Sequence, residues 1–290
     1  MNISPIYSSY NRNYPVTVNK KQVAFEANPN SQKLRFAYND FFVFMKGYGH
    51  DTVWADKVKT IADEAVEKIK TSSSSDEVLP YIASGIKKVN KLCYGNWNSW
   101  KRQHSGILRT SRNCYGRAGE WKGKCITTPV VNQYESYEQR LFPLIKYPLK
   151  KPYKDMSMTT VGYYDNEGRV IQLIHGDDDK INNVLDKVNK HFGKLKEDFI
   201  SKPENVTEST LPKINENIAE IRWLMAHSMP WERGSDSISN IFMRALYKSM
   251  GVKTSPLKKG VSLDMEAFCT PLNEYKQNFH TYFENKPKVV

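Results

Sequence analysis

The stretch LPKINENIAEIRWLMAHSMPWERGSDSISNIFMRALYKSMG, residues 211–251, decides the fold that we predict from this sequence. Apolar side chains recur in its first half at the spacing of one helix face: Ile214, Ile218, Ile221 and Met225. Pro230 ends that helix because it has no amide hydrogen and restricts the residue before it. The second half repeats the helical spacing with Ile238, Ile241, Phe242, Ala245 and Leu246. The stretch therefore predicts two helices joined by a broken turn.

Two ionisable side chains share one direction on the first of these helices. Glu220 and His227 are seven residues apart. Since a helix turns about 100° per residue, seven residues return to within about 20° of the same direction. Glu216, one turn earlier, extends this polar row. A helix glutamate is ordinarily a solvated residue and a histidine near a helix end often serves the helix dipole, so the pair is a hypothesis for a catalytic site.

The start of the second helix has the features of an anion site. Arg233, Gly234 and Ser235 stand there, beside backbone amides that a helix leaves unbonded in its first turn. A guanidinium, these amides and a glycine that allows close approach suit a phosphate or pyrophosphate. Ordinary helix capping by Ser235 or Asp236 is the structural alternative.

Composition limits the classes of protein that fit. The chain has 290 residues and a formal charge of +12, with small lysine clusters but no nucleic-acid-binding motif, so we expect no nucleic-acid partner. It has no apolar run near the roughly 20 residues of a transmembrane helix, so we expect no stable membrane insertion. Its four cysteines form no CxxC pair and no His/Cys cluster with zinc spacing, and we expect no metal site.

The polar N-terminus, residues 1–30, lacks the basic start and apolar core of a secretory signal peptide. We expect it to be a flexible segment, compatible with a secretion signal for a needle-type system. Residues 31–290 are then one catalytic domain of α+β class, mainly helical with a small antiparallel β-hairpin. The hairpin is predicted at 157–175 around a turn at 165–168. Helices are predicted at 52–71, 76–93, about 134–147, 178–200 and, in part, 264–285.

Two further regions allow a structural or a functional interpretation. The aromatic run at 34–45 contains Tyr38, Asn39 and Asp40, which are either core and capping residues or the wall of a cofactor pocket. The Gly-, Trp- and Arg-rich region 94–130 is either a solvated basic loop or a surface for a nucleotide or protein. Its candidate contacts are Arg109, Arg112, Tyr115, Arg117 and Trp121.

A glutamate aligned with a histidine beside an anion site suits transfer of a group from a nucleotide to a protein hydroxyl. If the donor is NAD, nicotinamide leaves and an oxocarbenium-like centre develops on the ribose. Glu220 would then stabilise that centre or act as base. His227 would orient Glu220 or the acceptor hydroxyl.

The motif EIRWLMAHSMPWERGSDSI, together with YNDF at 38–41, resembles the CteC-like bacterial type III effector family of ubiquitin-directed threonine ADP-ribosyltransferases. The resemblance implies an enzyme secreted into the host cytoplasm that transfers ADP-ribose from NAD to a threonine of host ubiquitin and so blocks ubiquitination. It implies that Glu220 and His227 are catalytic and that Tyr38, Asn39 and Asp40 bind the cofactor. The chain lacks the Arg…Ser-Thr-Ser…Glu-x-Glu pattern of the commoner ADP-ribosyltransferases.

Two other functions remain open. The segment from His227 to Ser235 is superficially similar to a Fic loop, which would imply transfer of AMP from ATP to a host protein. The Fic pattern HPFxxGNGR is not met, because Met229-Pro230 replaces Pro-Phe and the second glycine and final arginine are missing. The chain could also be a basic interaction module without catalytic activity, for which Glu220 would be dispensable.

Overall fold

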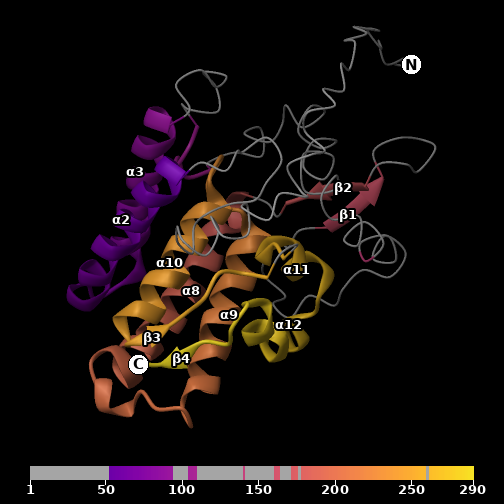
Figure 1. Ribbon diagram of the computed structural model, residues 1–290. Coiled ribbons are helices and arrows are strands. Elements are labelled where there is room, and N and C mark those ends of the chain that lie inside the picture. The colour runs from indigo at the N-terminus through magenta and orange to yellow at the C-terminus, as the bar shows by residue number, and fades with distance from the viewer. Residues whose placement is uncertain are drawn as a thin grey trace, which may run out of the picture. The chain divides into compact units, whose positions relative to one another are not determined.

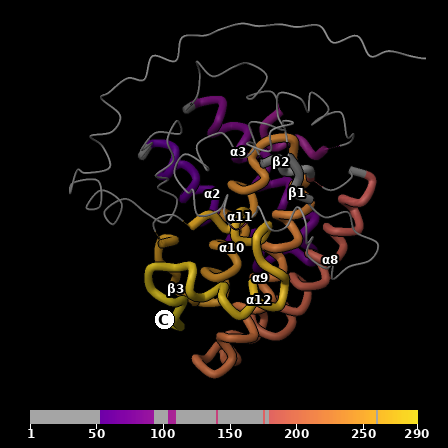
Figure 2. Tube along the Cα trace, turned by 90° about the vertical axis from the view of Figure 1, so that its right-hand side faces the viewer, coloured from indigo at the N-terminus to yellow at the C-terminus, as the bar shows by residue number. Residues whose placement is uncertain are grey.

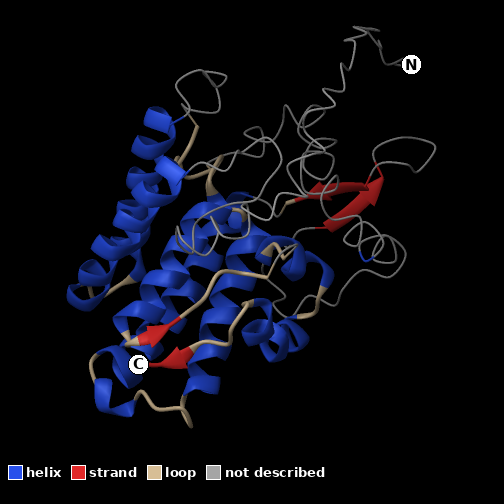
Figure 3. Cartoon of the chain, viewed as in Figure 1, coloured by secondary structure: helices blue, strands red, loops and turns tan. Residues whose placement is uncertain are grey.

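The computed structural model of the chain describes residues 52–93, 104–109, 140, 160–163, 171–175, 178–258 and 261–290. All of them fall within one compact unit, Tyr38–Val290. Helices dominate, accompanied by two short antiparallel strand pairs (Figure 3), so the predicted mainly helical α+β class is confirmed. The predicted boundary near residue 30 lies outside the described residues.

Helix α9, Leu211–Ser228, is the centre of the helical core and contacts α8, α10, α11 and α12 (Figure 1). It ends before Pro230, as predicted. The prediction of one apolar stripe beside a polar row holds only for its first half, where Glu216 is exposed. Every residue from Ile218 to Ser228 is buried, because neighbouring helices cover this part of α9 on all sides. Charged residues in this half are therefore core residues.

Helix α10, Ser235–Ser249, lies between α9 and a helical hairpin formed by α2, Thr52–Thr71, and α3, Ser75–Cys93. The range of α2 is as predicted, and α3 begins one residue before its predicted start at 76. The Trp54 indole nitrogen donates a 2.9 Å hydrogen bond to Asn90 Oδ1, which joins the start of α2 to the end of α3. The backbone then turns at Gly251, with a φ of 70° that favours glycine.

The predicted helix at 178–200 consists of three consecutive parts. A 3-10 turn at Asp178–Lys180 leads into α8, Ile181–Leu195, and a π-helical turn, η4, covers Lys196–Ile200. Asn189 of α8 accepts hydrogen bonds from Ser74 and Ser75 through its side-chain oxygen, at 2.9–3.1 Å. This contact fixes the start of α3 against α8. A short 3-10 turn, Pro203–Asn205, then precedes α9.

The predicted β-hairpin is present as β1, Thr160–Tyr163, paired antiparallel with β2, Ile171–Ile174. A second pair joins β3, Val252–Lys253, to β4, Lys288–Val289 (Figure 1), and β3 lies close to the C-terminus in Figure 2. The segment predicted as partly helical contains α11, Leu263–Cys269, α12, Leu272–Asn278, and η6, Phe279–Tyr282. Of the predicted helix at 134–147, only Arg140 is described, and it is helical.

None of the helices in the described ranges combines the length and apolar character needed to cross a bilayer. Within the same residues, His, Cys, Asp and Glu side chains do not gather in groups of three or more that could hold a metal ion.

Candidate functional site at the break between two helices

The chain between α9 and α10 is held in an uncommon backbone conformation. Met229 has a φ of 41°, in the left-handed region that non-glycine residues seldom adopt. Gly234 has a φ of 88° and precedes the first residue of α10. A Cβ atom on Gly234 would lie 3.2 Å from Cγ2 of Ile86 in α3. Glycine is therefore required here by conformation and by packing against α3, which differs from the predicted role of admitting a ligand.

Residues 104–109 run beside this break and hold it in place. Three backbone hydrogen bonds of 2.8–2.9 Å link the two segments: Gly106 to Arg233, Glu232 to Ile107 and Arg109 to Pro230. The His104 side chain also pairs with the Glu232 carboxylate. The break is thus a fixed feature of the fold, supported by a segment more than 120 residues earlier in the chain.

Arg109 is the described member of the predicted arginine-rich surface, and it is buried, with 3% of its surface exposed. Its Nη2 atom donates a 2.7 Å hydrogen bond to the carbonyl oxygen of Ser228. That carbonyl belongs to the last turn of α9, where helix carbonyls have no partner within the helix. Arg112, Tyr115, Arg117 and Trp121 lie outside the described residues, as do Tyr38, Asn39 and Asp40.

The predicted capping of α10 by Ser235 or Asp236 is wrong. The residue before the helix is Gly234, which has no side chain to form a capping hydrogen bond. Ser235 Oγ instead accepts a 3.0 Å hydrogen bond from the Trp231 amide and donates one of 2.9 Å to the Trp231 carbonyl. The Ser235 hydroxyl therefore stabilises the turn that begins at Trp231. Arg233, within this turn, is half-buried.

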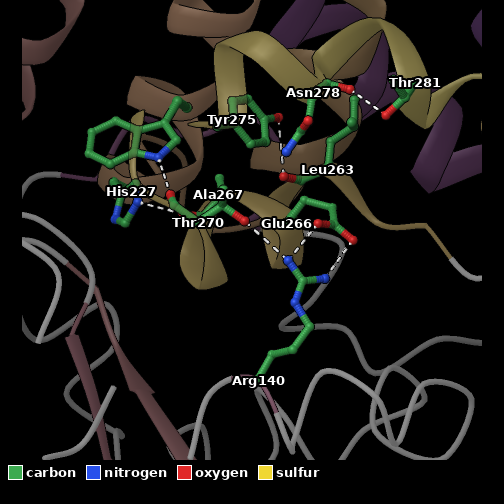
Figure 4. Close-up of polar contacts among 10 residues, drawn as sticks. Arg140, His227, Leu263, Glu266, Ala267, Thr270, Tyr275, Asn278 and Thr281 are labelled. Atoms are coloured by element: carbon green, nitrogen blue, oxygen red, sulfur yellow. Dashed lines mark hydrogen bonds and ion pairs between the residues drawn. The ribbon is translucent and has the colours of Figure 1, made fainter. Parts of the chain in front are cut away.

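His227 is 3% exposed and is held on three sides. Its Nε2 atom lies 3.0 Å from the Ala267 carbonyl oxygen of α11, so this nitrogen carries the proton that is donated (Figure 4). The imidazole lies 4.0 Å from the Trp223 ring, centre to centre, and 5.5 Å from the Phe268 ring, which it meets edge-on. These contacts fix both the orientation and the tautomer of the ring.

Glu220 is 8% exposed and lies where α9 meets α8 and α12. Its carboxylate oxygens are 2.9 Å from Lys276 Nζ and 3.4 Å from His191 Nε2. Since a helix rises 1.5 Å per residue, Glu220 and His227 are separated by about 10 Å along the axis. The structure therefore buries both predicted catalytic residues on α9 but gives them different neighbours.

Arg222 is a site residue that the sequence interpretation missed, because it stands in the apolar run IRWLM. It is fully buried, and its Nη2 atom lies 2.8 Å from Asp236 Oδ1 and 3.1 Å from Asp264 Oδ1. These carboxylates come from the first turns of α10 and α11. A charged residue is rarely buried this completely without partners, and the signal in the sequence was the charge itself within a core segment.

The ionisation of this cluster follows from its burial. Burial lowers the pKa of Arg222, but Asp264 and Asp236 more than offset this, so the guanidinium stays charged. The pKa of Asp264 lies well above its ordinary value because of burial and the adjacent Asp236 carboxyl, which outweigh the lowering by Arg222. Strongly shifted pKa values of this kind are more frequent at functional sites than elsewhere.

Helix α11 positions several of these side chains at once. Besides Asp264 and the Ala267 carbonyl, it presents Glu266 to Arg140 through two hydrogen bonds of 2.9 and 2.8 Å, in a fork-to-fork arrangement (Figure 4). The Thr270 carbonyl oxygen, just after α11, accepts a 3.1 Å hydrogen bond from the Trp223 indole. This short helix therefore fixes the second half of α9.

His175, for which the sequence shows no partner, lies directly after β2 and beside this cluster. Its ring centre is 5.9 Å from that of Phe268. Burial lowers the pKa of His175 to about 3, with further lowering by Arg109 and His227. The three cationic or potentially cationic side chains therefore come close to one another at the end of α9.

The depressed pKa of His175 makes a prediction about acid stability. Between pH 3 and 6.5 the unfolded chain binds a proton at this residue and the folded chain does not, so stability falls as the pH drops through this window. We expect His175→Gln to remove this pH dependence. Between pH 6.5 and pH 5, the variant should lose about 1–2 kcal/mol less of its free energy of unfolding than the unmodified protein. Denaturant unfolding of both proteins at the two pH values measures it. Equal losses would contradict the assigned protonation state.

Residues 144–286 match the AvrB_AvrC avirulence protein family. The match covers just under half of the chain and includes β1, β2 and everything from α8 to η6. The AvrB_AvrC match therefore spans α9, the break, α10 and α11, but not the 104–109 segment or the α2–α3 hairpin. No curated protein matches the chain.

Proposed function

We propose that the protein is a bacterial effector enzyme, secreted into the host cytoplasm, that transfers ADP-ribose from NAD to a threonine hydroxyl of host ubiquitin and so blocks ubiquitination. The AvrB_AvrC match supports the effector part of this proposal, since avirulence proteins act on a host. The NAD donor and the ubiquitin acceptor rest on the resemblance of the α9–α10 motif to the CteC-like family.

One observation carries the catalytic part: charged and ionisable side chains are buried at the break between α9 and α10. They come from α9, α10, α11, the 104–109 segment and the end of β2. Burial of unlike charges with shifted pKa values is the arrangement that enzymes use to prepare acids, bases and anion-binding groups. Arg109, Arg222, His227 and Asp264 are the buried members, His175 and Asp236 are partly exposed beside them, and Glu220 is buried about 10 Å away along α9.

The proposed reaction replaces one bond at the ribose carbon with another. The carbon–nitrogen bond to nicotinamide breaks, and its electron pair leaves with nicotinamide. The threonine oxygen then bonds to the same carbon, and its proton passes to a base. A carboxylate such as Glu220 stabilises the positive charge that develops on the ribose, and His227 orients the reacting hydroxyl.

Intact-mass spectrometry tests this proposal. Ubiquitin incubated with the protein and NAD is expected to gain the mass of one ADP-ribose unit. Parallel incubations with ATP in place of NAD identify the donor. A gain of AMP from ATP would favour the Fic-like alternative, and no gain on any protein of a host lysate with any donor would favour the non-catalytic interaction module.

The contribution of Glu220 is tested in the same assay with a shape-conserving change. We expect Glu220→Gln to lower the transfer rate about 100-fold, because the charge that stabilises the transition state is lost. Glu216→Gln is the matched control, since Glu216 is exposed one turn earlier on the same helix. Normal transfer by the folded Glu220→Gln protein would remove Glu220 from the mechanism.

A further inference from the structure

We infer that the outer face near the end of α3 is a docking surface for an acidic, partly apolar segment of a partner protein. This surface, which we name the α3 face, consists of Lys87, Lys88, Lys91 and Leu92, with Val53 of α2 beside them. All five residues are exposed, and none belongs to the AvrB_AvrC match or to the buried cluster at the break. The inference is therefore independent of the proposed reaction.

The pairing of α2 with α3 places two exposed aliphatic side chains opposite each other. The two helices lie side by side (Figure 1), and the Tyr81 hydroxyl of α3 donates a hydrogen bond to Glu64 of α2. Leu92 lies eleven residues after Tyr81, and Val53 lies eleven residues before Glu64. Eleven residues turn a helix to within about 20° of the starting direction, so both side chains lie on the face of the Tyr81–Glu64 contact. The open end of the hairpin thus presents Val53, 57% exposed, and Leu92, 69% exposed, to solvent.

A strip of positive charge follows the exposed side of α3. Residues 84–93 carry three lysines and no acidic residue, and the acidic residues of α3 lie in its first turn, about 15 Å from Lys87. Within the described part of the chain, the side chains of Lys87, Lys88 and Lys91 form no ion pair and no hydrogen bond. The helix dipole accounts for Lys91 in the last turn, but not for the other two. The strip therefore holds charge that no described side chain neutralises.

The 104–109 segment lies on the side of α3 away from α2. The Asn90 side-chain nitrogen donates a 2.7 Å hydrogen bond to Ser105 Oγ, and the segment also lies against the carbonyl of Ala83, seven residues before Asn90 and thus on the same side. Gly85, which packs against α2, is two residues from Ala83, a turn of about 200°. The lysine strip therefore runs between α2 and the 104–109 segment.

Exposed apolar side chains border the strip on both sides. Val53 and Leu92 stand toward α2, and Ile107 and Leu108 belong to the 104–109 segment. In the part of the chain that the structure describes, five large hydrophobic side chains are exposed, and four of them are at these two borders; the fifth is the C-terminal residue. Exposed apolar residues that are grouped in this way, and not scattered singly, mark interaction surfaces.

The composition of the α3 face selects an acidic protein segment as its partner. The ammonium groups attract carboxylates, and the aliphatic borders bury apolar side chains on either side of them. A lipid surface fits less well, because it is flat and meets the long lysine side chains before the shorter Leu92 and Leu108. A second copy of this chain also fits less well, because its formal charge is +12 and like charges repel.

Fluorescence anisotropy of a labelled peptide with the full chain tests the inference. The probe is a short helical peptide with glutamates along one face and leucines on either side of them, and its control has glutamine in place of every glutamate. At low salt the glutamate peptide is expected to bind at least about 10-fold more tightly than the control, and its affinity should fall as salt is added. No binding of the glutamate peptide, or equal binding of both peptides, would overturn the inference.

Two variants locate the binding on the α3 face. Lys87→Glu/Lys91→Glu is expected to weaken binding of the glutamate peptide at least about 10-fold, and Leu92→Ser about 3-fold. Both change exposed side chains and should remain folded, which circular dichroism checks. The matched control is Lys253→Glu/Lys288→Glu, which makes the same change of charge at two exposed lysines that face each other across the β3–β4 pair. Equal weakening by this control would show attraction by net charge alone and would overturn the inference.

The other occupants of such a face give different results. Sedimentation with phosphatidylserine-containing vesicles that requires Lys87 and Lys91, without binding of the glutamate peptide, would assign the α3 face to a membrane. A dimer that Leu92→Ser dissociates in sedimentation equilibrium would assign it to a second copy. Either result would overturn the inference. None of these measurements involves NAD or ubiquitin, so the docking surface and the proposed function can fail separately.

Discussion

Replacing Arg222 with alanine is expected to lower the free energy of unfolding by about 3–5 kcal/mol. The guanidinium is fully buried and its Nη2 atom bridges Asp236 and Asp264, at 2.8 and 3.1 Å. Removing it leaves the Asp264 carboxyl, with a side chain that is 10% exposed, without its cationic partner in the core. The bridge also joins α9 to the first turns of α10 and α11, so its loss weakens three helices together.

Thermal and denaturant unfolding measure this effect. At about 2–4 °C per kcal/mol for a domain of this size, the midpoint temperature should fall by about 6–20 °C. Lys213→Ala is a control, because the Lys213–Asp198 ion pair is 2.8 Å long but exposed to solvent, and its loss is expected to leave the stability almost unchanged. A loss below 1 kcal/mol for Arg222→Ala would contradict the importance of the bridge.

A double variant separates the unpaired carboxyl from the lost packing. Arg222→Met fills much of the space without a charge, and adding Asp264→Asn removes the buried acid that it leaves unpaired. The double variant is expected to recover part of the stability that Arg222→Met loses, because burying an unpaired charge costs more than burying a neutral amide. If the double variant is no more stable than Arg222→Met, the stability lost on replacing Arg222 comes from packing and not from the unpaired carboxyl.

The contrast between α9 and its surroundings shows what local sequence patterns determine. The ranges of α2, α3 and the β1–β2 hairpin follow from apolar spacing and turn residues, which are properties of neighbouring positions. Spacing gives the direction of a side chain on α9 but not what covers that direction. The burial of Glu220 and Arg222 depends on α8, α11 and α12, which lie 29–56 residues away at the contacts of these side chains. Only the tertiary fold reveals that their half of α9 is core.

For the candidate site as well, the sequence predicts local features but not the tertiary neighbours. Pro230 predicts the break itself, and the helical spacing before Pro230 predicts that His227 lies near the end of α9. The sequence marks Arg109 as a candidate contact of the 94–130 region but does not place it beside α9, and it gives no sign of the position of His175, because both come from segments distant in sequence. Asp236 and Ser235 were expected to cap α10, but Asp236 pairs with Arg222 of α9, Ser235 bonds to Trp231 within the turn, and Gly234 precedes the helix.

Replacing Gly106 with alanine is expected to destabilise the protein by about 3–5 kcal/mol, although the change adds a single methyl group. Gly106 has a φ of 71°, which strains any residue with a Cβ atom. The new Cβ would overlap the Ala83 carbonyl oxygen of α3 and lie 3.0 Å from the carbonyl carbon. Backbone atoms within a helix cannot move aside as a flexible side chain does, so the 104–109 segment must shift.

That shift has consequences at the break, because the Gly106 amide donates a 2.9 Å hydrogen bond to the Arg233 carbonyl. Moving it also displaces Arg109, whose hydrogen bond to the Ser228 carbonyl is expected to weaken together with stability. Gly193→Ala is the matched control: beyond the helix's own backbone, no heavy atom lies within 4 Å of its new Cβ near the C-terminal end of α8, and we expect stabilisation by about 0.5–1 kcal/mol. Unfolding curves of Gly106→Ala and Gly193→Ala measure the two changes in stability. Equal and small effects would show that α3 does not confine the 104–109 segment, and the support of the break would then need another source.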